Sequence, residues 1–135
     1  MHFEAQGQKS YNAGTFDFSN GGSGTGYQFY IVYLAAGSVL TLTSSPTTQV
    51  PIGTLLDAPS AGQAGMVRLT SAQGTSNVIA GSTSIAIGTP LISSASGQAT
   101  PWTATGQYVI GYSLEVATAV GQIIEYLPAG SFIHY

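Results

Sequence analysis

The sequence predicts an all-β protein, a small barrel- or sandwich-like domain with an extended N-terminal arm. Its 18 glycines and 6 prolines recur at short intervals and leave few stretches that could hold a helix of about 10 residues. The apolar residues also lack the 3.6-residue period of an amphipathic helix. In residues 107–116 they alternate with other residues instead, which is typical of a strand. The side chains expected on one face of that strand are Tyr108, Ile110, Tyr112, Leu114 and Val116.

Residues 1–25 differ from the rest and are predicted to form the arm. Phe16 and Phe18 alternate with polar residues, and a run of Ser, Asn, Gly and Thr follows over residues 19–26, a composition typical of a flexible linker. We therefore divide the chain into an arm with its Gly/Ser linker, residues 1–25, and a β-domain, residues 26–135. The arm is expected to become ordered against a neighbouring subunit, and its candidate contact residues are Phe3, Tyr11, Phe16 and Phe18.

The β-domain is predicted to consist of short strands joined by turns. Residues 27–34 are apolar on both faces, as in a strand that is covered on two sides. Residues 50–56 contain Pro51, which favours the start of a strand or a sheet edge. No strict sequence repeat is visible. The other strands are expected at residues 38–43, 66–70, 77–80, 84–87, 90–93, 122–127 and 132–135, with a turn at Ser96 and Gly97.

Charged residues are unusually rare. They make up 5% of the chain, against about 25% in an average soluble domain. With only 2 lysines or arginines the chain cannot form a phosphate-binding patch, so neither nucleic acid nor an anionic membrane is an expected partner. No apolar run approaches the length of about 18 residues that spans a bilayer, and the N-terminus lacks the pattern of a signal peptide. The chain has no cysteine and hence no disulfide.

Residues that could support catalysis or bind a metal ion are scarce. The sequence contains no Gly-x-Ser-x-Gly elbow, no phosphate-binding loop and no dinucleotide fingerprint. His2 and His134 lie at opposite ends of the chain, whereas a metal site usually needs three or four ligands held together. We therefore expect no enzyme activity, no catalytic or metal-binding residues and no cofactor.

Glu115 and Glu125 flank a predicted turn at residues 119–122. A two-residue loop would place their carboxylates on opposite faces of the hairpin. A three-residue loop that ends at Gly121 would place them directly opposite each other, where like charges repel unless a cation or a proton intervenes. We expect two outward-facing carboxylates that aid solubility or pair at a subunit interface, and a general acid/base or cation site is the alternative.

Aromatic residues form the other notable group. Tyr27, Phe29, Tyr30 and Tyr33 lie within one predicted strand and are expected to line the core. An exposed subset would mark a protein interface or a surface on which sugars stack. Trp102, in a predicted loop, is the best single candidate for a contact anchor.

Several short stretches of the second half occur in a recognisable order. They are residues 65–69 (GMVRL), 87–91 (IGTPL), 96–99 (SGQA) and 109–125 (VIGYSLEVATAVGQIIE). In this order and spacing, residues 50–127 resemble the capsid cement, or decoration, proteins of bacteriophages. Within these stretches Gly97, Gly111 and Gly121 are expected to permit turns or a close approach of two backbones.

The resemblance implies a small barrel-like module, often a homotrimer, that binds the major capsid protein on the outer surface of the virion and stabilises the capsid. It implies no catalytic residues. The alternative hypothesis is a trimeric fibre or adhesin module that binds glycans through exposed aromatic side chains.

Overall fold

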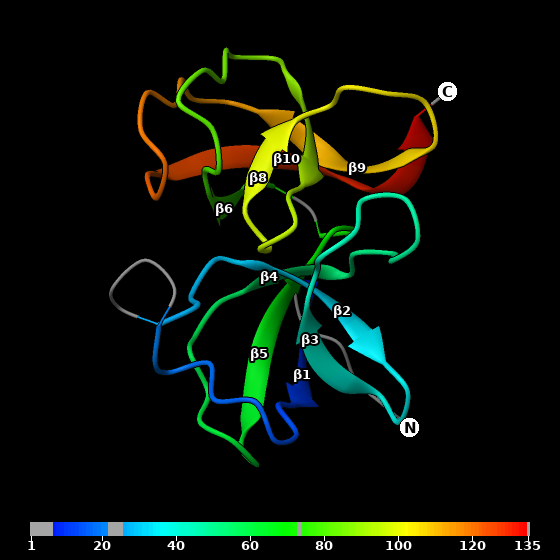
Figure 1. Ribbon diagram of the computed structural model, residues 1–135, viewed down its shortest axis with the longest axis vertical. Helices are drawn as coiled ribbons and strands as arrows, with labels where there is room; N and C mark the ends of the chain where they lie inside the picture. Colours follow the sequence, from blue (N-terminus) through cyan, green and yellow to red (C-terminus); the bar gives the residue numbers. More distant parts are fainter. Residues whose placement is uncertain (1–6, 22–25, 73, 135) are drawn as a thin grey trace.

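The computed structural model describes residues 7–21, 26–72 and 74–134, with side chains up to residue 129 (Figure 1). These residues form strands and turns and contain no helix, so the prediction of an all-β, barrel-like fold is confirmed. The strands are β1 (Gln8–Asn12), β2 (Ile31–Ala35), β3 (Val39–Leu42), β4 (Gly53–Leu55), β5 (Ala64–Leu69), β6 (Ser76–Ile79), β7 (Pro90–Ser93), β8 (Ala99–Pro101), β9 (Gln107–Ser113) and β10 (Ile123–His134).

The first five strands close into a barrel in the order β1-β3-β2-β4-β5. β1 pairs with β5 along its whole length, from Gln8 to Asn12. It pairs with β3 only once, through the parallel pair Asn12 and Val39. The contact between β1 and β3, which we call the seam, therefore has fewer paired residues than any other contact between neighbouring strands of the barrel. Apolar side chains fill the barrel: Ala13, Phe18, Val32, Leu40, Leu55 and Val67 are all buried in one cluster.

The last five strands form a second sheet in the order β6-β10-β9-β7-β8, stacked on the barrel along the long axis of the molecule (Figure 1). Backbone bonds join the two units: Ile31 N donates to Gly97 O at 2.7 Å, and Tyr108 N donates to Pro46 O at 2.7 Å. The side chain of Ile31, from the barrel, belongs to the buried cluster of the second sheet. The two units therefore share part of one interior.

The two units have the same topology. The barrel, taken from its seam, runs β3-β2-β4-β5-β1, and the second sheet runs β8-β7-β9-β10-β6, so each strand has a counterpart at the same place in the other unit. A parallel bridge between Ala80 and Ala99 joins the end of β6 to β8, just as the pair Asn12 and Val39 joins β1 to β3. The chain is thus a structural repeat, which the sequence did not reveal.

The expectation of a separate arm is wrong for residues 7–21. β1 is a full strand of the barrel, and Phe18 lies at the centre of the barrel core with none of its surface exposed. The two ends of the predicted linker lie together on the barrel, because Tyr27 N donates to Phe18 O at 2.9 Å. The physical reason is that β1 satisfies the edge of β5, which the sequence alone does not show.

Other strands begin or end differently from the expectation. The strand predicted at residues 27–34 begins only at Ile31, because Phe29 adopts a positive φ of 68° within a turn. Residues 84–87 form no strand, and Ile85 makes an isolated bridge with Ala117. The strand predicted at 107–116 ends at Ser113. The two strands expected at 122–127 and 132–135 are one strand, β10, with an irregularity after Pro128.

Candidate attachment surface

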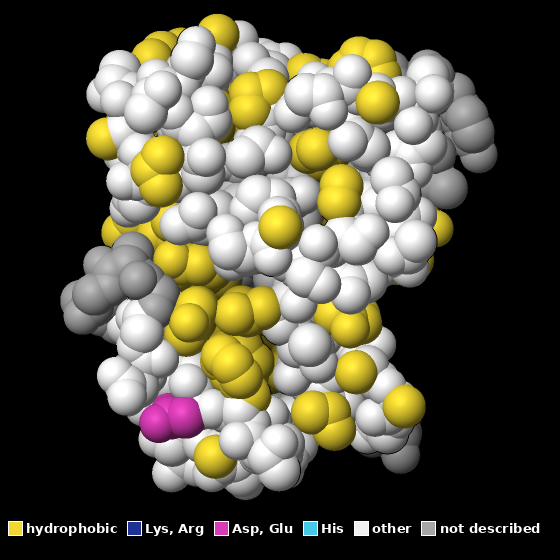
Figure 2. All heavy atoms as spheres, in the orientation of Figure 1, with side chains coloured by type: hydrophobic (Ala, Val, Ile, Leu, Met, Phe, Trp, Pro, Cys, Tyr) yellow, Lys and Arg dark blue, Asp and Glu magenta, His cyan; other side chains and the backbone are white. Residues whose placement is uncertain are grey.

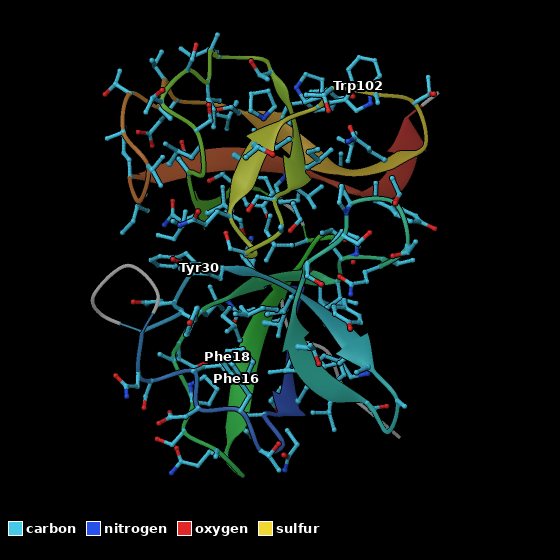
Figure 3. All side chains as sticks on the ribbon, viewed as in Figure 1. Phe16, Phe18, Tyr30 and Trp102 are labelled. Carbon is cyan, nitrogen blue, oxygen red and sulfur yellow. The ribbon has the colours of Figure 1, made fainter. Side chains whose placement is uncertain are left out.

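An aromatic ladder runs up one side of the barrel towards the second sheet. The rings of Phe16 and Phe18 meet edge to face with their centroids 4.6 Å apart, and Phe16 also contacts Tyr27 at 5.5 Å. Tyr27 in turn contacts Tyr30 at 5.0 Å, again edge to face. Figure 3 shows Phe16 and Phe18 in the barrel unit and Tyr30 at its junction with the second sheet. This geometry is the favourable one for aromatic rings, so the ladder fixes the segment before the loop against the barrel.

Phe16 is the exposed end of this ladder. Its side chain is 43% exposed, whereas Phe18 is fully buried. In Figure 2 apolar atoms gather on the same side of the barrel, and the drawn face shows acidic atoms at one place and no basic side chain. The surface around Phe16 therefore offers apolar contact with little charge.

Phe16 also forms one wall of a hollow of about 290 Å³. The other wall is strand β3, and the hollow opens over the seam between β1 and β3. Among the described residues, none that lines the hollow is charged, and only two threonines contribute polar side chains. The lining residues are Ala13, Thr15, Phe16, Val39, Leu40, Thr41 and Leu42.

The other predicted contact residues are dispersed. Phe3 lies outside the described residues. Tyr11 packs half-buried against the barrel core, with Lys9 Nζ lying 5.1 Å from the centre of its ring. Trp102 is half-buried on the second sheet, far from Phe16, and its backbone N donates to Pro90 O at 2.8 Å (Figure 3). The structure thus brings together Phe16 and Phe18 but not Trp102.

The three predicted glycines serve different geometries. Gly97 and Gly121 lie in turns with φ values of 77° and 90°. Gly111 lies inside β9, where a side-chain carbon would collide with the carbonyl oxygen of Leu127 on β10. It therefore permits a close approach of two strands, one of the two roles expected for these glycines.

Glu115 and Glu125 lie close together, but neither predicted hairpin register occurs. β9 ends at Ser113 and β10 begins at Ile123, so the connection is longer than any tight turn. Glu115 Oε1 accepts a hydrogen bond from Glu125 N at 3.1 Å, and Glu125 Oε2 accepts one from Thr75 Oγ1 at 2.8 Å. The two carboxylates thus serve as local hydrogen-bond acceptors. Within the described part of the chain, no three His, Cys, Asp or Glu side chains are grouped as a metal site would require.

The second sheet carries a set of exposed apolar side chains. Alternation along β10 buries Ile124 and Tyr126 and turns Ile123 and Leu127 outward. More apolar residues lie in the connection between β9 and β10, where a strand end and a tight turn are predicted from the sequence. The set comprises Ile87, Leu114, Val116, Val120, Ile123 and Leu127.

A polar cluster lies buried where the two units meet. The hydroxyl oxygens of Thr54, Ser76 and Tyr126 are inaccessible and have no hydrogen-bond partner of good geometry among the residues that the structure describes. Burial raises the pKa of Tyr126 to about 12, and the nearby hydroxyls of Thr54 and Ser76 and the charge of Arg68 oppose that shift. Tyr126 is therefore neutral at physiological pH and acts as a packing group of the junction.

The fold and the surface define a charge-poor, all-β protein made of two stacked five-stranded units. Within the described part of the chain, no helix is long and apolar enough to span a membrane. No protein-family model and no curated protein sequence matches this chain. Among solved structures, it is similar to the N base of the head fiber protein gp8.5 of bacteriophage phi29.

That similarity has a TM-score of 0.68 and covers 95% of this chain and 99% of the other, with 19% sequence identity. At this identity the likeness shows a shared fold. It extends over both units, so the whole two-unit architecture is common to the two proteins.

Proposed function

We propose that this chain is a non-enzymatic structural protein of a bacteriophage head, which binds the outside of the capsid lattice and stabilises it. The observation that carries the proposal is the likeness in fold, over nearly the whole chain, to a base domain of a phage head fiber. The low charge and the apolar surface around Phe16 support it, because such a surface favours contact with another protein over nucleic acid. The resemblance of residues 50–127 to capsid cement proteins points to the same class.

The proposed partners are the major capsid protein and further copies of this chain. The exposed apolar residues of the second sheet have the character of a subunit contact, and the resemblance to cement proteins favours a trimer. Sedimentation velocity of the purified chain measures this state directly. A monomer at all concentrations up to those found on a particle would remove the trimer from the proposal.

Binding to capsids tests the main proposal. Capsids of the parent phage that lack the protein are mixed with the purified chain, pelleted and analysed for bound protein. Decorated capsids are then compared with bare ones for resistance to heat or osmotic shock. Saturable binding with increased resistance supports the proposal, and an absence of binding contradicts it.

Glycan binding is the second candidate function, favoured by the exposure of Phe16 beside a hollow. An exposed aromatic ring can stack on a sugar, but of the described residues at the hollow only Thr15 and Thr41 could supply side-chain hydrogen bonds to the sugar hydroxyls. A glycan array probed with the chain and with Phe16→Ala separates the two candidates. Binding that Phe16→Ala abolishes would favour the adhesin.

A further inference from the structure

The structural repeat allows each surface of the barrel to be compared with its counterpart in the second sheet. The correspondence extends to single hydrogen bonds. Ser44 N bonds to the side-chain oxygen of Gln49 at 2.7 Å, and in the second unit Thr103 N bonds to that of Gln107 at 3.0 Å. A difference between two such closely matched units therefore indicates a place where one of them has become specialised.

The two units differ at the outer edge of one strand, which is β3 in the barrel and β8 in the second sheet. In the second sheet, Gly81 N donates to Ala99 O at 2.7 Å, so the chain that follows β6 covers the edge of β8. In the barrel the corresponding amide is Gly14 N, which donates instead to the side chain of Asn12, at 2.6 Å from Oδ1. The chain then turns away towards Phe16, and the edge of β3 faces the hollow.

The backbone of Leu42 points into this hollow. Thr43 N donates to Ile31 O, so the amide of Thr43 faces β2. Because hydrogen-bonding directions alternate along a strand, the N–H and C=O of Leu42 face the opposite way, towards the seam. The paired residue Val32 agrees with this, since its carbonyl accepts from Ile52 N and not from β3.

The counterpart of Leu42 in the second sheet is a proline. Leu42 pairs with Val32 across β3 and β2, and Pro101 pairs with Leu91 across β8 and β7, at the same place in the two units. Proline has no N–H and is one of the residues that protect a strand edge against the addition of another strand. The second unit therefore carries a protected edge where the barrel carries an open one.

We infer that the open edge of β3 accepts an extended, uncharged segment of the capsid shell protein as an additional strand; this rests on the proposed function. The edge determines the backbone conformation of the occupant, because its N–H and C=O groups, which no described residue pairs with, match those of another strand. The hollow determines which side chains the occupant can have, because the lining of the hollow is apolar and uncharged and Phe16 forms its outer wall. At about 3.3 Å per residue, the edge from Leu40 to Leu42 holds a segment of about three or four residues.

Leu42→Pro tests the inference with a change that the fold already accommodates in its second unit. Its matched control is Leu42→Ala, which shortens the same half-buried side chain but keeps the N–H. Both variants are first compared with the parent chain by circular dichroism and thermal unfolding. Binding to capsids that lack the protein is then measured for all three. Leu42→Pro is expected to bind at least about tenfold more weakly than Leu42→Ala, as the loss of backbone hydrogen bonds at an interface requires.

A second pair of variants leaves the core untouched. Thr41→Lys places a charge at the hollow, and Ser71→Lys places the same charge on an exposed turn outside it. Only Thr41→Lys is expected to weaken binding. In hydrogen exchange of capsid-bound protein, peptides covering β3 are expected to gain protection, which a purely side-chain contact would not produce.

The outcomes separate the inference from the proposed function. If the parent chain does not bind capsids, the proposed function and its occupant are both wrong. If it binds, and Leu42→Pro and Thr41→Lys bind as tightly as their controls, the proposed function stands and the inference is overturned. Self-association of the parent chain that Leu42→Pro abolishes would also overturn it, because the occupant would then be a second copy.

Discussion

Gly53 and Gly111 occupy the same place in the two units, and each brings two strands into close contact. A side-chain carbon on Gly53 would collide with the carbonyl oxygen of Arg68, and one on Gly111 with that of Leu127. Both obstacles are backbone atoms of the next strand and cannot rotate away. The close approach is therefore a property of the repeated unit, since it occurs in both copies with different neighbouring side chains.

Gly111→Ala is expected to destabilise the protein by about 3 kcal/mol or more, because the added carbon must push β10 away from β9. Gly121→Ala is the matched control, since no atom lies near its added carbon and only the positive φ opposes the change. The cost of that φ is about 1–2 kcal/mol. Urea unfolding of both variants measures the difference, and equal losses would contradict the collision.

Phe18→Ala is expected to lower the free energy of unfolding by about 3–5 kcal/mol, because it opens a cavity in the barrel core. Phe16→Ala removes a neighbouring ring that is 43% exposed and should cost about 1 kcal/mol or less. Thermal unfolding distinguishes the two. Deletion of residues 1–20 should likewise unfold the barrel, since it removes both β1 and Phe18. A stable, folded product would instead support the prediction that residues 1–25 form an independent arm.

Alkaline pH is expected to weaken the junction between the two units. The pKa of Tyr126 is about 12 in the folded chain, above its ordinary value of 10.0, because burial disfavours the phenolate. The unfolded chain therefore releases this proton first, and stability that is fully present below pH 10 is lost as pH rises towards 12. The loss amounts to about 2–3 kcal/mol.

The measurement is urea unfolding at a series of alkaline pH values, for the parent chain and for Tyr126→Phe. The variant keeps the ring but cannot ionise at this position, so its stability should fall less steeply over that interval. If the free energy of unfolding falls equally steeply with pH in the two proteins, the ionisation of Tyr126 does not weaken the junction.

Salt is expected to leave the protein on its particle. Only 5% of residues are charged, and exposed ion pairs contribute about 0–1 kcal/mol each. Raising the ionic strength from about 0.1 M to 1 M shortens the Debye length from about 10 Å to 3 Å and leaves apolar contacts intact or strengthened. Pelleting of decorated capsids across such a series measures the bound fraction, and stepwise release would show that the few charges dominate.

Much of the fold could be predicted from the sequence because it depends on local patterns. The range 90–93 matches β7 as observed, and the strands expected at 38–43 and 77–80 fall within a residue of β3 and β6. These segments are short, rich in β-branched or apolar residues and bounded by turn residues. β1 and β8 were not predicted because their residues are polar or small, and β1 also pairs with β5, which lies far away in the sequence.

The candidate surface was predictable only in part. Phe16 and Phe18 could be predicted as contact residues because both are aromatic. That Phe16 is exposed and Phe18 is buried could not be predicted, because it depends on where the barrel closes. The open edge at Leu42 could not be predicted. It is recognised by comparing Leu42 with Pro101, its counterpart in the second unit, and the sequence shows no repeat that would suggest this comparison. The two units keep their topology while most side chains differ, so the sequence shows no strict repeat.

The backbone hydrogen bond between Tyr27 N and Phe18 O has a practical consequence. At 2.9 Å it joins two residues on either side of the Gly- and Ser-rich segment, so the barrel wall is already closed between them. An epitope or a fluorescent label inserted into the sequence between Phe18 and Tyr27 should therefore leave the barrel wall intact.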